Sequence, residues 1–187
     1  MTKIAFITPF YLPARLSGSN IVVQQLAEGL DKSNFEVCVV SGEYLNTRQW
    51  YLPFFGPKIQ EKFSIINGVK IYRVGCFQIA SLLALVLIRY FKFLLPKKLH
   101  QKVLFLHSGP YFRGLARILQ REKFDIVYSS PFPLYFNWQV AQGIKRNSPR
   151  TKLIFRPDFH AEVEEFSSPE LQKVFDSADF IHIALGP

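Results

Sequence analysis

The chain has 187 residues, of which 49% are hydrophobic and 16% aromatic, with a formal net charge of +9. This length suits one domain, and this composition fills a sizeable core. The two cysteines, Cys38 and Cys76, are far apart in the sequence. Their spacing excludes a cysteine metal motif and a disulfide framework, and it fits a reducing cytosol.

The positive charge is concentrated in one part of the chain. Residues 89–123 contain nine Lys or Arg and one acid, Glu122, whereas the rest of the chain has 14 basic and 13 acidic residues. One basic block on a nearly neutral body predicts an anionic partner at a defined face. The alternative is a solvated helix face. Nucleic acid is not the expected partner, because the aromatic residues lie in apolar runs rather than in a stacking platform.

Apolar strands alternate with helical patterns along the chain. Strands are predicted at 3–8, 35–41, 125–129, 152–156 and 179–184, and helices at 19–32, 78–95, 98–121, 133–147 and 168–177. The first helix is predicted to begin with Ser19 or Asn20 as its cap. Asn67-Gly68 joins two further apolar runs, which predicts a hairpin over 63–74 with a tight primed turn. This order predicts an α/β domain built on a parallel sheet.

Residues 79–95 form the most apolar segment, Ile79-Ala-Ser-Leu-Leu-Ala-Leu-Val-Leu-Ile-Arg-Tyr-Phe-Lys-Phe-Leu-Leu95. The run contains Arg89 and Lys92 and meets Pro96, so it is too short and too charged to span a bilayer comfortably. It fits a helix that lies in the membrane surface with its basic residues at lipid headgroups. A buried core helix is the alternative. No secretory signal is predicted, because the first strand begins at Lys3 without an apolar leader.

Several enzyme motifs are missing. Gly18 is the only glycine in the first loop, so the dinucleotide-binding fingerprint is absent. The sequence contains neither a Walker phosphate loop nor a Gly-x-Ser-x-Gly nucleophile elbow. His160-Ala-Glu-Val-Glu164 has an acid where a zinc protease needs its second histidine. These absences argue against a nicotinamide enzyme, a hydrolase of the elbow type and a zinc protease.

Ligands of an open parallel sheet gather at the carboxyl ends of the strands. The loops expected there are 9–18, 42–44, 130–133 and 157–160. The last contains Asp158 and His160, which could act as a base or orient a sugar hydroxyl. The alternative is a structural histidine satisfied by a nearby carboxylate. Gly18, directly before a helix, predicts an anion site formed by free backbone N–H groups.

A series of short motifs runs through nearly the whole chain in a familiar order. It includes Pro9-Phe-Tyr-Leu-Pro13, Leu16-Ser-Gly-Ser-Asn20, Phe124-Asp-Ile-Val-Tyr-Ser-Ser-Pro131 and Lys152-Leu-Ile-Phe-Arg-Pro-Asp-Phe-His160. With these motifs the chain resembles the N-terminal, acceptor-side domain of family-four glycosyltransferases, similar to members that build bacterial surface polysaccharides. The resemblance implies that residues 1–187 are a Rossmann-like domain, one half of a GT-B fold, without the C-terminal donor domain.

The resemblance also implies a function. The domain would bind a lipid-linked or glycan acceptor, while a second domain, on a possible donor-domain chain, would bind a nucleotide-sugar donor. No cofactor and no metal would be needed. Gly18 and Ser19 match the donor-phosphate loop, although the family commonly has two adjacent glycines there. Asp158 and His160 match residues that different members carry, so which of them acts stays open. Arg89, Lys92, Lys97, Lys98 and Lys102 would contact the acceptor or membrane.

The expected location is cytoplasmic, peripheral at the inner face of the membrane. Because the donor domain is missing, the chain is expected to be inactive alone, as a fragment or as one subunit of a split enzyme. The alternative is a non-catalytic membrane-binding or scaffolding protein derived from the same fold.

Overall fold

Strands buried on both faces alternate with helices that cover them. The computed structural model describes residues 1–14, 18–51, 56–77, 108–157 and 169–182, with positions 86, 90, 96, 99, 105 and 106. Strand β1 (Thr2–Thr8) lies at the centre of the sheet and pairs in parallel with β2 (Phe35–Gly42) on one side and β6 (Ile126–Phe132) on the other.

The sheet extends outward from these three strands in the order β3-β4-β2-β1-β6-β7-β8. Strands β4 (Val69–Phe77), β7 (Lys152–Pro157) and β8 (Phe180–Ile181) are parallel to their inner neighbours. Strand β3 (Phe63–Ile66) is antiparallel at one edge, and β5 (Tyr111–Arg113) pairs antiparallel with the end of β4. The six parallel strands follow the Rossmann order, with reversal between β1 and β6. The predicted α/β class is therefore confirmed.

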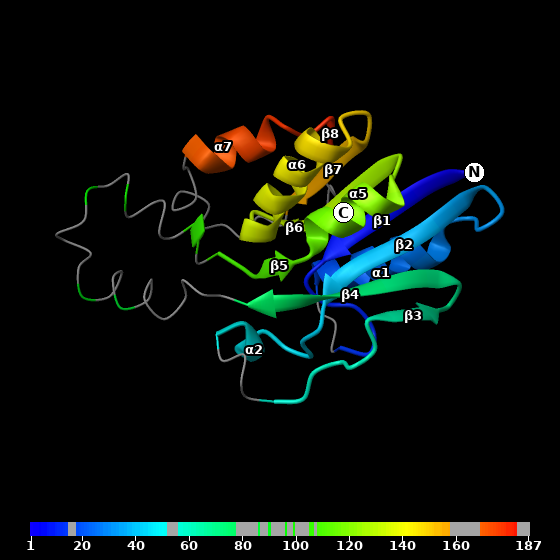
Figure 1. The fold of residues 1–187 in the computed structure, drawn as a ribbon, viewed down its shortest axis with the longest axis horizontal. Coiled ribbons are helices and arrows are strands. Elements are labelled where there is room, and N and C mark those ends of the chain that lie inside the picture. Colours follow the sequence, from blue (N-terminus) through cyan, green and yellow to red (C-terminus); the bar gives the residue numbers. More distant parts are fainter. Residues whose placement is uncertain are drawn as a thin grey trace, which may run out of the picture.

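Helices cover both faces of the sheet (Figure 1). Helix α1 (Ser19–Gly29) lies behind the sheet in that view, whereas α5 (Leu115–Glu122) and α6 (Tyr135–Asn147) lie in front. Helix α7 (Pro169–Phe175) contributes to the same core as α5 and α6, and the short α2 (Arg48–Tyr51) follows β2. We refer below to the α1 face and the α6 face of the sheet.

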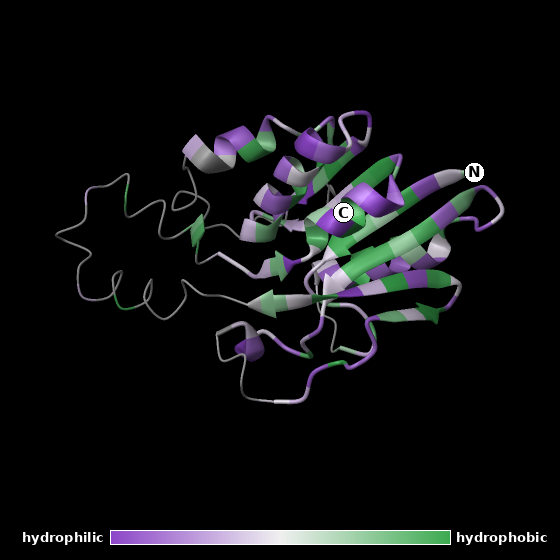
Figure 2. Ribbon diagram, viewed as in Figure 1, coloured by the Kyte–Doolittle hydropathy of each residue, from purple (hydrophilic) through white to green (hydrophobic). Residues whose placement is uncertain are grey.

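Side chains of each central strand alternate between two hydrophobic cores. Ile4 and Phe6 of β1 pack with α1, and Ala5 and Ile7 pack with the core that contains α6. Figure 2 accordingly shows mainly hydrophobic residues along β1 and β2 and many hydrophilic ones on the helices. Because both faces are covered, the strands read as nearly continuous apolar runs, which is why they could be located from the sequence. Cys38, mid-strand in β2, is a buried free thiol.

The predicted hairpin is confirmed. Ile66 of β3 pairs with Val69 of β4, and the two residues between them, Asn67 and Gly68, have φ angles of 50° and 76°. Two successive positive φ values define the primed turn that Asn-Gly favours, because its twist matches that of the flanking strands.

The helix predicted over 98–121 is confirmed at 115–121 but wrong at 111–113. Tyr111–Arg113 is the strand β5, and α5 begins only at Leu115. Gly114, between them, has a φ of 91°, a left-handed conformation that a continuous helix cannot contain. Most of the predicted helix 78–95 and of the segment 98–107 lies outside the described residues. The helices predicted at 19–32, 133–147 and 168–177 are confirmed with slightly shorter bounds.

Candidate functional site at the carboxyl ends of the strands

The point where the strand order reverses lies between β1 and β6. Ile7 of β1 pairs with Ser129 of β6, so the carboxyl ends of the two strands lie at the same level. The chain leaves β1 toward α1 on one face and leaves β6 toward α6 on the other. Diverging connections of this kind open a crevice in which α/β domains bind their ligands.

Buried hydroxyl groups mark this end of the sheet. Thr8, Ser41, Ser129 and Ser130 have no exposed surface, although each follows a run of apolar residues. The Thr8 hydroxyl donates to Oδ1 of Asn20 in α1 over 2.7 Å. The Ser129 hydroxyl donates to Oδ1 of Asn137 in α6 over 2.5 Å. These two bonds join the beginning of each helix to the strand that precedes it.

Asn137 also organises the turn after β6. Its amide nitrogen donates to the carbonyl oxygens of Pro131 and Leu134, at 2.8 and 3.0 Å. The side chain is completely buried, so these bonds satisfy its amide group, which would otherwise lack partners. The loop 130–133, predicted to form part of the site, is thereby held at the carboxyl edge.

The N-terminus of α1 is open. Gly18 occupies the cap position with φ 49° and ψ −123°, no side chain caps the helix, and the first turn contains no acid. The predicted cap, Ser19 or Asn20, is therefore wrong: both residues are already helical, and Asn20 instead accepts the bond from Thr8. Gly18 is exposed, whereas Ser19 is buried. The N–H groups of Ile21 and Val22 bond to the Gly18 carbonyl, so this helix end favours an anion mainly through its partial positive charge.

Ser130 provides a further buried polar group at this end of the sheet. It follows Ser129, where the pairing of β6 with β7 becomes irregular. Its hydroxyl is buried without a hydrogen-bond partner among the described residues. A buried hydroxyl of this kind is commonly completed by water, by a ligand or by another part of the chain.

Arg73 is a site residue that the sequence analysis did not identify. It lies on β4 in line with Val69 and Ile71, on the α1 face, and is only 4% exposed. Its guanidinium donates to the Ser41 hydroxyl over 2.8 Å, to the Tyr11 carbonyl over 3.3 Å and to the Leu12 carbonyl. The guanidinium therefore fastens the loop that leads from β1 to Gly18. Burial lowers the pKa of Arg73, and the negative charge of Glu61 opposes this shift.

Tyr11 holds the other side of the same loop. Its side chain is fully buried, and its hydroxyl donates to Glu28 of α1 over 3.2 Å. Burial raises the pKa of Tyr11, and the Glu28 carboxylate raises it further, so the phenol stays neutral at physiological pH. The first loop is thus attached to β4 through Arg73 and to α1 through Tyr11, which fixes the approach to Gly18.

The loop after β2 carries a buried carboxylate. Glu43 is bonded to Lys62 over 2.6 Å and to Lys58 over 2.9 Å. Burial alone would raise the pKa of Glu43, but the two lysine hydrogen bonds outweigh it and hold the pKa below its ordinary value. Glu43 is therefore an ion-pair anchor for the segment 58–62 rather than a candidate base.

The remaining predicted site residues lie outside the described residues. They are Asp158 and His160, and the basic residues Arg89, Lys92, Lys97, Lys98 and Lys102. Strand β7 is described to Pro157, the residue before Asp158, and Pro157 is paired with Phe132 of β6. The loop that follows β7 thus starts beside the loop that follows β6. His182, not singled out from the sequence, lies after β8 with its Nδ1 2.8 Å from the Tyr128 hydroxyl.

The chemistry available in the described part of this edge is anion binding by N–H groups and hydroxyls. Among the described residues no three His, Cys, Asp or Glu side chains are grouped as metal ligands would be. No protein-family model matches the chain, and a comparison with curated proteins finds no match either. The function is therefore argued from the site alone, together with the resemblance noted in the sequence.

Proposed function

We propose that this domain is the acceptor-side half of a glycosyltransferase, which moves a sugar from a nucleotide-sugar to a lipid-linked or glycan acceptor. The observation that carries the proposal is the N-terminus of α1 at the point of strand reversal, where no described side chain caps the helix. A second domain holds the nucleotide-sugar. Its diphosphate approaches Gly18 and Ser19, because the N–H groups there favour negative charge and no side chain intervenes.

Each described group has a separate part in this proposal. The backbone at Gly18 and Ser19 stabilises the charge that develops on the leaving diphosphate. Ser130 donates to a phosphate or sugar oxygen, which satisfies its buried hydroxyl. Arg73 acts as a positioning residue, because it holds the loop that presents Gly18. Asp158 and His160, in the loop after β7, are proposed to face the reacting hydroxyl of the acceptor.

Sugar transfer is expected only when a donor-binding domain is present. Transfer requires donor and acceptor to be held together in reactive geometry. We expect no measurable turnover from residues 1–187 with a panel of UDP-, GDP- and dTDP-sugars and a polyprenyl-phosphate-linked sugar acceptor. Turnover is expected once a nucleotide-sugar-binding chain encoded by a neighbouring reading frame is added, and mass spectrometry of the acceptor measures it.

Three outcomes of this assay are informative. Robust turnover by residues 1–187 alone would show that no second domain is needed. Turnover by the complex, lost in His160→Ala but kept in Asp158→Asn, would assign the base or hydroxyl-orienting role to His160. If no combination transfers sugar, the non-catalytic alternative, a membrane-binding or scaffolding protein derived from this fold, is favoured.

The domain is proposed to contact the membrane, where a lipid-linked acceptor would lie, through residues 79–102. Three described positions in this segment have exposed apolar or aromatic side chains: Val86, Tyr90 and Leu99. Phe105, just beyond, is buried in the core on the α6 face. In the described parts of the chain, no helix has the length and hydrophobicity needed to cross a bilayer. Exposed apolar side chains next to basic residues suit contact with an anionic membrane surface.

Vesicle binding tests this contact. Each lysine near an anionic surface contributes about 1 kcal/mol, so reversing Lys97, Lys98 and Lys102 to Glu is expected to weaken binding at least about a hundredfold. Co-sedimentation with phosphatidylglycerol vesicles at several salt concentrations measures it, since screening should weaken the wild type. Arg48→Glu/Lys173→Glu, at two exposed positions elsewhere, is the control. Unchanged binding by the triple variant would favour a core helix over 79–95.

A further inference from the structure

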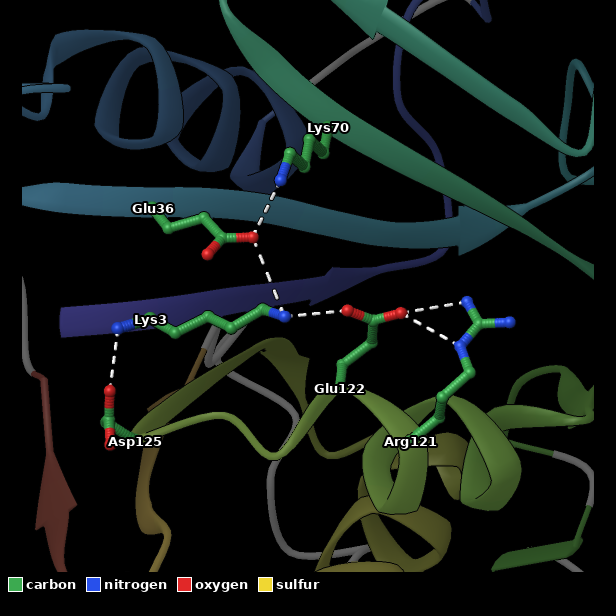
Figure 3. Close-up of polar contacts among 6 residues, drawn as sticks. All are labelled: Lys3, Glu36, Lys70, Arg121, Glu122 and Asp125. Atoms are coloured by element: carbon green, nitrogen blue, oxygen red, sulfur yellow. Dashed lines mark hydrogen bonds and ion pairs between the residues drawn. The ribbon is translucent and has the colours of Figure 1, made fainter. Parts of the chain in front are cut away.

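The amino-terminal edge of the sheet, opposite the candidate site, carries a network of charged side chains (Figure 3). The Lys3 ammonium lies 2.6 Å from Glu122 and 3.6 Å from Glu36, and its backbone N–H donates to Asp125. Lys70 and Arg121 complete the outer ends of the network. Lys3, Lys70 and Arg121 thus contact the carboxylates of Glu36 and Glu122, whereas Asp125 accepts the backbone N–H of Lys3.

The two glutamates of this network are ionised at physiological pH. The hydrogen bond from Lys70 lowers the pKa of Glu36 and outweighs the effect of burial. Burial raises the pKa of Glu122, but hydrogen bonds from Lys3 and Arg121 lower it by more. Both carboxylates are therefore ionised and are already paired with cations. They are not available to neutralise other positive charges nearby.

Four more cations lie beside this network without such partners. Lys123 follows α5, Lys145 and Arg146 end α6, and Arg150 lies in the connection to β7. All four are exposed, and none has a side-chain hydrogen bond or ion pair with a described residue. Between the ends of the two helices is a hollow of about 310 Å³, lined by Lys123, Phe124, Asp125, Asn147, Ser148, Pro149, Arg150 and Thr151.

The usual structural role of such cations is to offset the helix dipoles. The carbonyl end of a helix has a charge of about −0.5, so α5 and α6 together provide about −1. Four full positive charges exceed this by about three. Asp125 lines the hollow and its carboxylate accepts the backbone N–H of Lys3, so it offsets one of these charges and leaves an excess of about two. The excess positive charge around the hollow is therefore left for an external anion.

We propose that this hollow binds a phosphate group, through Lys123 and Arg150 at its walls and Lys145 and Arg146 beside it. Guanidinium and ammonium groups form short charge-assisted bonds with phosphate oxygens, and Asn147 and Ser148 add neutral donors. A volume of about ten water molecules accommodates a phosphate with one neighbouring group. The site lies at the opposite edge from Gly18 and does not depend on the proposed transferase function.

The test is a titration of the full chain with inorganic pyrophosphate. Binding is measured from shifts in the NMR spectrum of the backbone amides. Saturable shifts are expected at the amides of Lys123, Asn147, Ser148, Arg150 and Thr151. Lys123→Gln/Arg150→Gln is expected to raise the dissociation constant about tenfold, because two charge-assisted contacts are lost. Arg48→Gln/Lys173→Gln removes the same charge at exposed positions elsewhere and is expected to change it less than about twofold. Thermal unfolding of both double variants confirms that they are folded.

Vesicles with and without phosphatidylglycerol distinguish the source of the phosphate. Loss of pyrophosphate binding alone in Lys123→Gln/Arg150→Gln identifies a soluble phosphate compound, and loss of vesicle binding as well identifies a lipid headgroup. The proposal is overturned if the two double variants bind both probes equally. It is also overturned if pyrophosphate shifts only the amides near Gly18, or gives weak, unsaturable shifts over the whole surface.

Discussion

Replacing Arg73 with methionine is expected to lower the free energy of unfolding by about 3 kcal/mol. Methionine keeps most of the buried volume but removes three donated bonds, to Ser41, Tyr11 and Leu12. Hydrogen bonds from a charged group each contribute about 1.5–3 kcal/mol. Part of the stability lost with the three hydrogen bonds is regained, because the folded protein no longer has to desolvate a guanidinium.

Urea denaturation measures this change, with Arg113→Met as the matched control. Arg113 is exposed on β5 and has no side-chain partner among the described residues, so its replacement should change stability by less than about 0.5 kcal/mol. Arg73→Lys should be intermediate, since an ammonium reaches fewer of the three acceptors. If Arg73→Met is as stable as the wild type, the free energy needed to desolvate the guanidinium equals the stabilisation from its three hydrogen bonds. The first loop would then be held by Tyr11 and its neighbours.

The fold could be predicted because its signals are local. Apolar runs buried on both faces located the parallel strands, and Asn67-Gly68 located the turn between β3 and β4. Apolar strands that alternate with helical segments predict a mostly parallel sheet covered by helices. No long-range information was needed for these steps.

The break between β5 and α5 was missed for a physical reason. Residues 98–121 contain apolar and basic residues at helical spacing, but Gly109-Pro110 and Gly114 are local signs of an interruption that the prediction overlooked. The strand Tyr111–Arg113 forms because the end of β4 offers unpaired backbone groups and Phe112 fills the core beside Phe136. Both contacts are distant in sequence, so the pattern of the segment itself could not reveal them.

The position of Gly18 directly before α1 was predicted, but its surroundings were not. Asn20 was expected to cap α1, whereas its side chain accepts the Thr8 hydroxyl, a contact that depends on how α1 lies on the sheet. One available signal was overlooked. In Val69-Lys-Ile-Tyr-Arg73, alternation places Arg73 in phase with Val69 and Ile71, so an inward-facing arginine could have been recognised. The unpaired Ser130 hydroxyl carries no sequence signal, because it depends on the environment that the fold creates.

Gly18→Ala is expected to weaken diphosphate binding at the α1 N-terminus by about tenfold or more, because an L-residue strains this backbone by about 1–3 kcal/mol. The strain arises from the φ of 49°, and the effect is not steric crowding, since an added Cβ at Gly18 meets no atom within 4 Å. To relieve the strain, the backbone would move its N–H groups away from the crevice. Loss of binding would therefore report on backbone conformation.

Gly29→Ala is the matched control for this change. An added Cβ at Gly29 also meets no atom within 4 Å, and Gly29 ends α1 with an ordinary φ, so alanine should leave binding unchanged and slightly favour the helix. Titration with UDP, followed at the amides of Gly18 to Ile21, measures the affinity of each variant, and thermal unfolding measures its stability. Equal affinity in Gly18→Ala and Gly29→Ala would show that the open helix end does not bind the diphosphate. In that case Gly18 serves only to turn the chain into α1, and the donor phosphates must be held wholly by the second domain.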